Sequence, residues 1–250
     1  MALLTLSHLK KKYSMEVQTI VHVGAHEGQE VYDYLQAFPD VQINLFEPQI
    51  NLFEKLEKQF IKHQQVNLFN FALGSENGKS SMYISNNKGL SSSFYKPKDH
   101  LFEHPEVNFE LNKLNFDIKV LDEQKIFNID LLNIDTQGYE LEVLKGSVKA
   151  LSDNVKYLIL EINKKELYEG CPLVQDLDKF LNNFNFVRTD THYWLDSFSW
   201  GDAFYIRKDL VSFKKYVTSL IKNKLYGNKF LYKKLISLRN FIWKIRKKTS

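Results

Sequence analysis

Hydrophobic residues along the chain fall into two kinds of segment that alternate. Short apolar runs lack the polar alternation of a half-exposed strand, so we interpret them as strands buried on both faces. These runs are residues 19–23, 42–46, 129–134 and 157–162. Between them, apolar residues recur every three or four positions, as at Leu52, Leu56 and Phe60, and this spacing predicts amphipathic helices. Strands that alternate with helices predict an α/β fold, with a mostly parallel sheet covered by helices on both faces.

The rest of the chain has a less regular pattern. Residues 66–73 and 80–84 predict a third strand and a short partner, joined by a glycine-containing turn as a hairpin-type pair. Residues 85–116 show no clean period, and we interpret them as a long loop on the substrate side. The last strand, 203–206, follows the segment 185–187 without an intervening helix. This order predicts an antiparallel pair at one edge of the sheet.

Composition limits the class of protein. The 250 residues are 44% hydrophobic, which is enough for one large domain. Cys171 is the only cysteine, so an intrachain disulfide is excluded and a cysteine-based zinc site would lack ligands. No apolar run approaches the roughly 20 residues that span a bilayer, and the first residues do not form a signal peptide. A cytoplasmic protein is therefore expected.

Charge is distributed unevenly along the chain. Residues 211–250 hold 12 of the 34 Lys and Arg residues and none of the 30 Asp and Glu residues. Apolar residues recur at helical spacing through the same segment, for example at Phe213, Val217 and Leu220. This pattern predicts a domain at 1–210 and a basic amphipathic helical tail that binds an anionic membrane surface, at the inner face of the membrane. A homodimer contact and packing on the acidic domain are alternatives; nucleic acid is not predicted, because no nucleic-acid-binding module is recognisable.

The turn after the first strand carries the first candidate chemistry. Gly24 ends the strand, Gly28 follows, and a helical pattern begins, which is how a strand and a helix form a nucleotide site. Glu47 closes the second strand, where a carboxylate can accept both hydrogen bonds of a ribose diol. A dinucleotide site uses G-x-G-x-x-G because a pyrophosphate must approach the backbone, and here His26 occupies the middle position. The turn therefore favours S-adenosylmethionine, which has no phosphate, over NAD.

Asp135 follows the strand at 129–134, beside the expected ligand crevice. Its carboxylate could hold the ammonium group of the methionine moiety or accept a proton from a substrate. It could equally cap the next helix, because Asp is a preferred N-cap residue.

Several motifs together resemble one family. They are His22-Val23-Gly24-Ala25-His26-Glu27-Gly28, Phe46-Glu47-Pro48, Val120-Leu121-Asp122, Leu160-Glu161, Gly201-Asp202-Ala203-Phe204 and the stretch 129–146, of which Ile134–Gly146 is the most specific part. Through these motifs the chain resembles the FkbM family of S-adenosylmethionine-dependent methyltransferases. The resemblance implies a Rossmann-like class I methyltransferase fold and O-methylation of a hydroxyl group, typically on a sugar or natural product.

The resemblance also implies that Gly24, Ala25, His26 and Glu47 line the cofactor site. We extend the predicted cofactor site to these further positions: His22, Gly28, Pro48, Ala72 and Asp135. The candidate bases for the acceptor hydroxyl are Asp135, Glu161 and His26, since a carboxylate or a neutral histidine can accept a proton as the methyl is transferred. No metal is predicted, and a divalent ion between Asp122 and Asp135 is an alternative.

This chain departs from the family pattern at three positions. The family usually has Asp where this chain has His22, often Asn where it has His26, and often Lys where it has Asn133. His22 therefore cannot supply the usual carboxylate to the methionine end of the cofactor. These histidines are the least familiar feature of the predicted site.

The sequence as a whole predicts an S-adenosylmethionine-dependent O-methyltransferase. Its predicted acceptor is a hydroxyl group of a sugar, a glycan or a glycosylated metabolite. Two alternatives stay open. One is an NAD-dependent oxidoreductase on the same architecture, and the other is a non-catalytic adaptor that binds a cofactor and docks through its basic tail.

Overall fold

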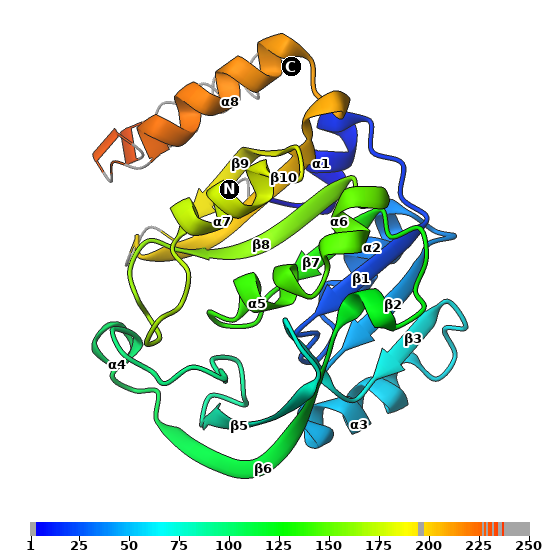
Figure 1. The fold of residues 1–250 in the computed structure, drawn as a ribbon, viewed down its shortest axis with the longest axis vertical. Helices are drawn as coiled ribbons and strands as arrows, with labels where there is room; N and C mark the ends of the chain where they lie inside the picture. The colour runs from blue at the N-terminus through cyan, green and yellow to red at the C-terminus, as the bar shows by residue number, and fades with distance from the viewer. Residues whose placement is uncertain are drawn as a thin grey trace, which may run out of the picture.

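The computed structural model describes residues 4–194 and 198–226, together with six positions further on: Asn228, Phe230, Leu231, Lys233, Lys234 and Ser237. A seven-stranded sheet forms its centre (Figure 1). In spatial order the strands are β3 (Val66–Phe69), β2 (Gln42–Phe46), β1 (Thr19–Val23), β7 (Leu131–Ile134), β8 (Tyr157–Asn163), β10 (Trp200–Arg207) and β9 (Phe186–Tyr193). The first five run parallel, and β10 lies between β8 and β9, antiparallel to both. The predicted parallel sheet with an antiparallel pair at one edge is confirmed.

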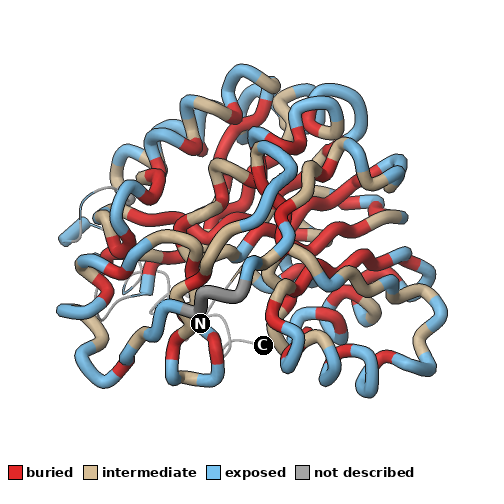
Figure 2. Tube along the Cα trace, turned by 60° about the horizontal axis from the view of Figure 1, so that its bottom comes forward, coloured by how far each residue is buried: buried red, intermediate tan, exposed pale blue. Residues whose placement is uncertain are grey.

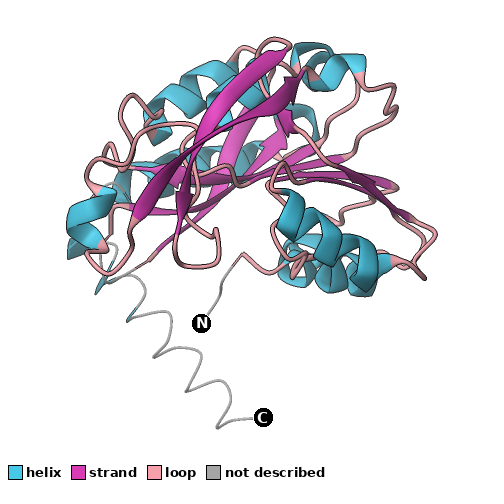
Figure 3. Cartoon of the chain, turned by 90° about the horizontal axis from the view of Figure 1, so that it is seen from below, coloured by secondary structure: helices cyan, strands magenta, loops and turns pink. Residues whose placement is uncertain are grey.

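Helices cover both faces of this sheet (Figure 3). On one face lie α1 (Leu6–Tyr13), α2 (Val31–Ala37) and α3 (Ile50–Phe60), and on the other lie α5 (Glu140–Lys145), α6 (Val148–Asp153) and α7 (Val174–Asn182). In β7, Leu131 packs toward α1 and α2 while Leu132 packs toward the second set of helices, and both side chains are fully buried. Figure 2 shows buried residues concentrated along the strands. Burial on both faces explains why these strands read as continuous apolar runs.

A second sheet of three strands was not predicted. It consists of β4 (Ala72–Leu73), β6 (Phe109–Lys119) and β5 (Gly78–Ser85), with β6 in the middle, and α4 (His100–Glu103) precedes β6. The prediction of one strand over 66–73 is wrong, because the chain leaves the main sheet at Asn70, whose amide donates to the carbonyl oxygens of Glu47 and Pro48. The predicted hairpin of 66–73 with 80–84 is also wrong, because β5 pairs with β6. Most of β6 lies within 85–116, the segment interpreted as a loop.

The end of the described chain returns to the main sheet. After the short 3-10 helix Lys208–Leu210, helix α8 (Phe213–Tyr226) packs against β9, where Asn223 Nδ2 donates to the carbonyl oxygen of Arg188 at 2.7 Å. Figure 1 shows α8 at one end of the molecule and the second sheet at the other. None of the helices among the described residues is long and apolar enough to span a membrane. Most of the predicted tail beyond Tyr226 lies outside the described residues, so the boundary at residue 210 stays a prediction.

Candidate active site

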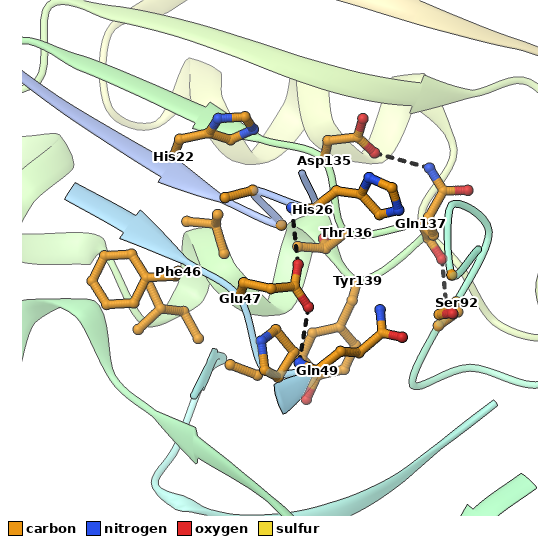
Figure 4. A pocket seen from close by; sticks show the side chains of 18 of the residues that line it. His22, His26, Phe46, Glu47, Gln49, Ser92, Asp135, Thr136, Gln137 and Tyr139 are labelled. Carbon is orange, nitrogen blue, oxygen red and sulfur yellow. Dashed lines mark hydrogen bonds between the residues drawn. The ribbon is translucent and has the colours of Figure 1, made fainter. Parts of the chain in front are cut away.

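A cavity opens where β1, β2 and β7 end. It holds about 810 Å³, counting the part open to solvent, within the usual size range of small-molecule sites (Figure 4). Its walls come from the turn after β1, the end of β2, β4, the loop at 89–94 and the turn after β7. Strand β1 pairs with β2 on one side and β7 on the other, so the strand order reverses here. Ligands of open α/β sheets bind at such a point.

The turn after β1 is shaped by glycine. Gly24 has φ +82°, and a Cβ there would lie 1.9 Å from the carbonyl oxygen of Asp135. The backbone amides of Gly24 and Ala25 both donate to the carbonyl oxygen of Phe46, at 3.0 and 3.1 Å. These bonds hold the turn close to the ends of β2 and β7, so its backbone forms one wall of the cavity.

Gly28, predicted to belong to the cofactor site, packs against α3. Its φ is +70°, and a Cβ there would lie 2.6 Å from the ring of Phe60 and 2.9 Å from Leu56, both on α3. Gly28 is not among the residues that line the cavity, whereas the other eight predicted cofactor-site residues are. The second glycine of the motif lets the turn pack against α3, and helix α2 begins only at Val31.

Glu47 is buried, with 3% of its surface exposed, and both of its carboxylate oxygens accept backbone hydrogen bonds. Oε2 accepts from the amide of His26 at 2.9 Å and Oε1 from the amide of Gln49 at 2.8 Å (Figure 4). Burial raises the pKa of Glu47 to about 7. A carboxylate has about four acceptor positions, so two remain for the hydroxyl groups of a ribose.

His26 fastens two loops together. Its backbone has φ +48°, and its ring Nε2 lies 3.0 Å from the carbonyl oxygen of Lys88, so Nε2 must carry the proton in this contact. Nδ1 is buried and has no hydrogen-bond partner among the residues described. The ring is thus occupied in holding the loop at 86–89, and the lone pair of Nδ1 is not open to the cavity.

Asp135 and Glu161, two of the predicted bases, lie together. Gln137 Nε2 donates to Asp135 Oδ1 at 2.9 Å and to Glu161 Oε2 at 2.8 Å, and its Oε1 accepts from the hydroxyl of Tyr168 at 3.1 Å. Burial and the negative charge of Asp135 raise the pKa of Glu161 well above its usual range, and burial also raises the pKa of Asp135. Burial therefore favours the protonated form of both carboxyl groups, and the negative charge of Asp135 adds to this effect at Glu161.

Two interpretations of acidic residues need correction. Helix α5 begins at Glu140, so Asp135 is not its N-cap residue. Asp122 accepts the backbone amides of Lys149 and Ala150, at 2.7 and 2.9 Å, and so caps α6 instead of holding an ion with Asp135. Among the described residues, no cluster of three or more His, Cys, Asp or Glu side chains has the arrangement of a metal site.

His22 and Asn133, two departures from the family pattern, meet at Tyr34. Asn133 Nδ2 donates to the Tyr34 hydroxyl at 2.6 Å, and that hydroxyl lies 3.2 Å from His22 Nδ1. Burial lowers the pKa of His22, so its ring is neutral near pH 7. Tyr34 can donate to Nδ1 of this neutral ring, which places the ring proton on Nε2.

Sequence reasoning missed several residues of the site. Gln137 belongs to the most specific motif, but no role was predicted for it; its position right after Asp135 was the available signal. Glu140 fixes the same turn, since its Oε1 accepts from the amides of Thr136 and Gly138 at 3.1 and 3.0 Å. Asp202 of β10 pairs in register with Glu161, and an acidic residue within an otherwise apolar strand was the signal for it.

The cavity fits S-adenosylmethionine by the charge of its walls. Glu30, Glu47 and Asp135 line it, and no Lys or Arg does. S-adenosylmethionine carries a sulfonium and an ammonium group, which carboxylates attract, whereas a pyrophosphate would find no cation here. The charge of the walls therefore disfavours the NAD alternative.

Three comparisons identify known proteins that this chain resembles. The methyltransferase FkbM domain matches residues 22–188. The 2-O-methyltransferase NoeI of Sinorhizobium fredii is 30% identical over 179 residues, which cover 67% of this chain and 72% of NoeI. The crystal structure of methyltransferase FkbM from Methylobacillus flagellatus matches with a TM-score of 0.52 at 12% identity, and the match covers 76% of this chain and 43% of that chain.

Proposed function

Because the chain belongs to the FkbM family of methyltransferases and uses S-adenosylmethionine as its cofactor, we propose that it methylates a hydroxyl group of a sugar, in a glycan or a glycosylated metabolite. The O-methylation itself agrees with the relative NoeI, which is described as a 2-O-methyltransferase. The observation that carries the proposal is the polar wall formed by Asp135, Gln137 and Glu161 beside the cofactor cavity. Such a wall suits an acceptor with several hydroxyl groups.

The protein's own part in the reaction is to hold the reactants and to move one proton. S-adenosylmethionine, when bound, supplies a methyl group on a positively charged sulfur. Glu47 would hold the ribose diol, and Asp135 and Glu30 would face the charged methionine end. Asp135 accepts the proton of the acceptor hydroxyl, because its raised pKa makes it a better base near neutral pH than an ordinary aspartate.

The acceptor is tested by incubating the protein with a pool of glycans and cofactor carrying an isotopically labelled methyl group. Mass spectrometry is expected to find the label on glycans, and NMR of the product is expected to place it on oxygen. A label found only on nitrogen or carbon atoms would overturn the proposal. Cofactor binding without any transfer, combined with partner binding that depends on residues 211–250, would favour the adaptor alternative.

We also propose that the basic tail holds the enzyme at an anionic membrane surface. In α8, Tyr216, Ser219 and Asn223 face the domain, while an adjacent stripe is exposed, with Phe213 at 80% and Ile221 at 58%. An exposed apolar stripe in a segment with many basic and no acidic residues suits the boundary between lipid headgroups and acyl chains. A lipid-linked sugar acceptor would be presented at the same surface.

A further inference from the structure

A second cavity adjoins the first. It holds about 730 Å³, counting the part open to solvent, and shares His22, Glu30 and Asp135 with the cofactor cavity. It lies between α2 and the sheet face formed by β1, β7, β8 and β10. Its other lining residues are Leu4, Leu6, Asp33, Tyr34, Asn133, Ile159, Glu161 and Asp202. A molecule in this cavity therefore reaches Asp135, the proposed base, which also lines the cofactor cavity.

The walls of the second cavity are strongly acidic. Five carboxylic acids line it and no Lys or Arg does; the acids are Glu30, Asp33, Asp135, Glu161 and Asp202. Within the described part of the chain none of the five belongs to a salt bridge. Glu30, Asp33 and Asp202 also accept no side-chain hydrogen bond from the residues described. The ionised members of this cluster repel one another, and a positively charged ligand would relieve that repulsion.

The floor of this cavity is built from buried polar side chains. His22 is 2%, Glu161 5% and Asn133 7% exposed, yet all three line it. Nδ1 of His22 contacts Tyr34, and Nε2 has no hydrogen-bond partner among the described residues. Polar side chains in a cavity wall can hydrogen-bond a polar ligand, and the ring N–H of His22 is a donor for one.

We propose that the second cavity binds the acceptor, and that this acceptor carries an ammonium group as well as the hydroxyl group that receives the methyl. An amino sugar has this chemistry. The inference rests on the proposed O-methylation and names the class of its substrate. Asp33, Glu161 and Asp202 line the second cavity but not the first, so they are placed to hold the acceptor instead of the cofactor.

This arrangement also explains why oxygen would be methylated in the presence of an amine. Carboxylates around an ammonium group favour its protonated form, which has no lone pair with which to attack a methyl group. The hydroxyl oxygen forms the new bond to the methyl carbon, the carbon–sulfur bond breaks with its electron pair left on sulfur, and the hydroxyl proton passes to Asp135. The products are the methyl ether and S-adenosylhomocysteine.

The test measures binding to the full-length protein saturated with S-adenosylhomocysteine, so that only the second cavity is open. Glucosamine, N-acetylglucosamine and glucose are titrated by calorimetry near neutral pH. Glucosamine is expected to bind about tenfold or more tightly than the two neutral sugars, as a charge-assisted hydrogen bond requires. Asp202→Asn and Asp33→Asn should each weaken glucosamine binding about tenfold and leave the affinity for S-adenosylhomocysteine within about twofold.

Asp40→Asn is the matched control, because Asp40 is exposed and lines neither cavity. It should change neither affinity. Retained affinity for S-adenosylhomocysteine shows that each variant is folded. Equal binding of the three sugars would overturn the proposal, and so would an Asp202 variant that loses both ligands equally. Methylation of neutral glycans alone would overturn this inference but leave the proposed function standing, whereas tight glucosamine binding with no methylated hydroxyl on any acceptor would overturn the proposed function.

Discussion

At the scale of single residues, the chemistry centres on Asp135 and the two side chains that hold it. Gln137 is fixed by the hydroxyl of Tyr168 and donates to both Asp135 and Glu161, and burial together with the negative charge of Asp135 raises the pKa of Glu161. The motif places Asp135 and Gln137 by spacing, but Glu161 comes from another strand. In the proposed reaction the three act as one unit, with Asp135 as the proton acceptor.

Replacing Asp135 tests this assignment. Asp135→Asn should lower kcat about 100-fold or more, because general-base catalysis typically contributes at least that much. Steady-state kinetics on the identified acceptor would measure it. Glu161→Gln should lower kcat less, because an uncharged glutamine side chain resembles the protonated form of Glu161 that burial favours. If Asp135→Asn kept kcat within a few-fold of the native value, the base would have to be another group.

Replacing Glu47 tests the ribose contact. Glu47→Ala should weaken binding of S-adenosylhomocysteine by about 1.5–3 kcal/mol, the range for a hydrogen bond to a charged group. The ligand's hydroxyl groups donate to the ionised form, whose pKa lies near 7. Binding should therefore weaken as the pH falls below about 7, and this part of the pH dependence should vanish in the variant. Calorimetry across that range checks both points, and unchanged affinity in Glu47→Ala would remove Glu47 from the site.

At the scale of elements, the connection from β1 through its turn to α2 uses its two glycines for different purposes. Gly24 lies against the backbone of Asp135, which cannot move without disturbing β7. Gly28 lies against side chains of α3, which can shift. The motif in the sequence shows two glycines but not this difference, because the neighbours come from residues 56–60 and 135.

This difference predicts that alanine substitutions at the two glycines have different effects. Gly28→Ala should lower the free energy of unfolding by about 1–3 kcal/mol, from a positive φ and a crowded contact with Phe60. It should affect cofactor affinity only slightly in the folded protein. Gly24→Ala should lower both the free energy of unfolding and the affinity for the cofactor, because its Cβ would clash with the backbone carbonyl oxygen of Asp135. Denaturant unfolding and calorimetry together separate the two effects, and a Gly28 variant that folds normally but loses the cofactor would contradict them.

The strands show where a sequence pattern suffices and where it fails. β1 and β2 were predicted to the residue, because burial on both faces leaves an uninterrupted apolar run with clear ends. β5 and β6 are partly exposed and their register shifts between Ser80 and Met82, so polar and apolar positions do not alternate regularly. Their pairing also depends on partners far apart in the chain. The second cavity was missed for the same reason, since its walls come from α2 and four strands.

At the scale of the whole molecule, the basic helix α8 lies at the end opposite to the second sheet (Figure 1). Helix α8 is also fixed to the domain, where Lys215 Nζ donates to the carbonyl oxygen of Lys12 at 2.9 Å. A surface that attracts the tail would therefore orient the domain as well as bind it.

The membrane proposal is tested with vesicles. Phe213→Asp combined with Ile221→Asp should reduce cosedimentation with vesicles containing phosphatidylserine several-fold, because two exposed apolar contacts are lost and two negative charges are added. Phe127→Asp is the control, since Phe127 is 73% exposed but lies outside the tail. Equal sedimentation of native and doubly substituted protein would contradict the proposal. If the native protein formed a dimer and the two substitutions converted it to a monomer, the stripe would be a contact between two copies.

The position of β10 has a consequence for the growing chain during synthesis. Among the described residues, β9 pairs only with β10, and β10 is the last strand, inserted between β8 and β9. A nascent chain that has emerged only to residue 194 already contains the strands and turns that surround the cofactor cavity, but it leaves the edge of β8 open and β9 without a neighbour. Unpaired strand edges promote aggregation, so a nascent chain that stalls before residue 207 would be prone to aggregate. Asp202, on the wall of the second cavity, reaches its place only with this final insertion.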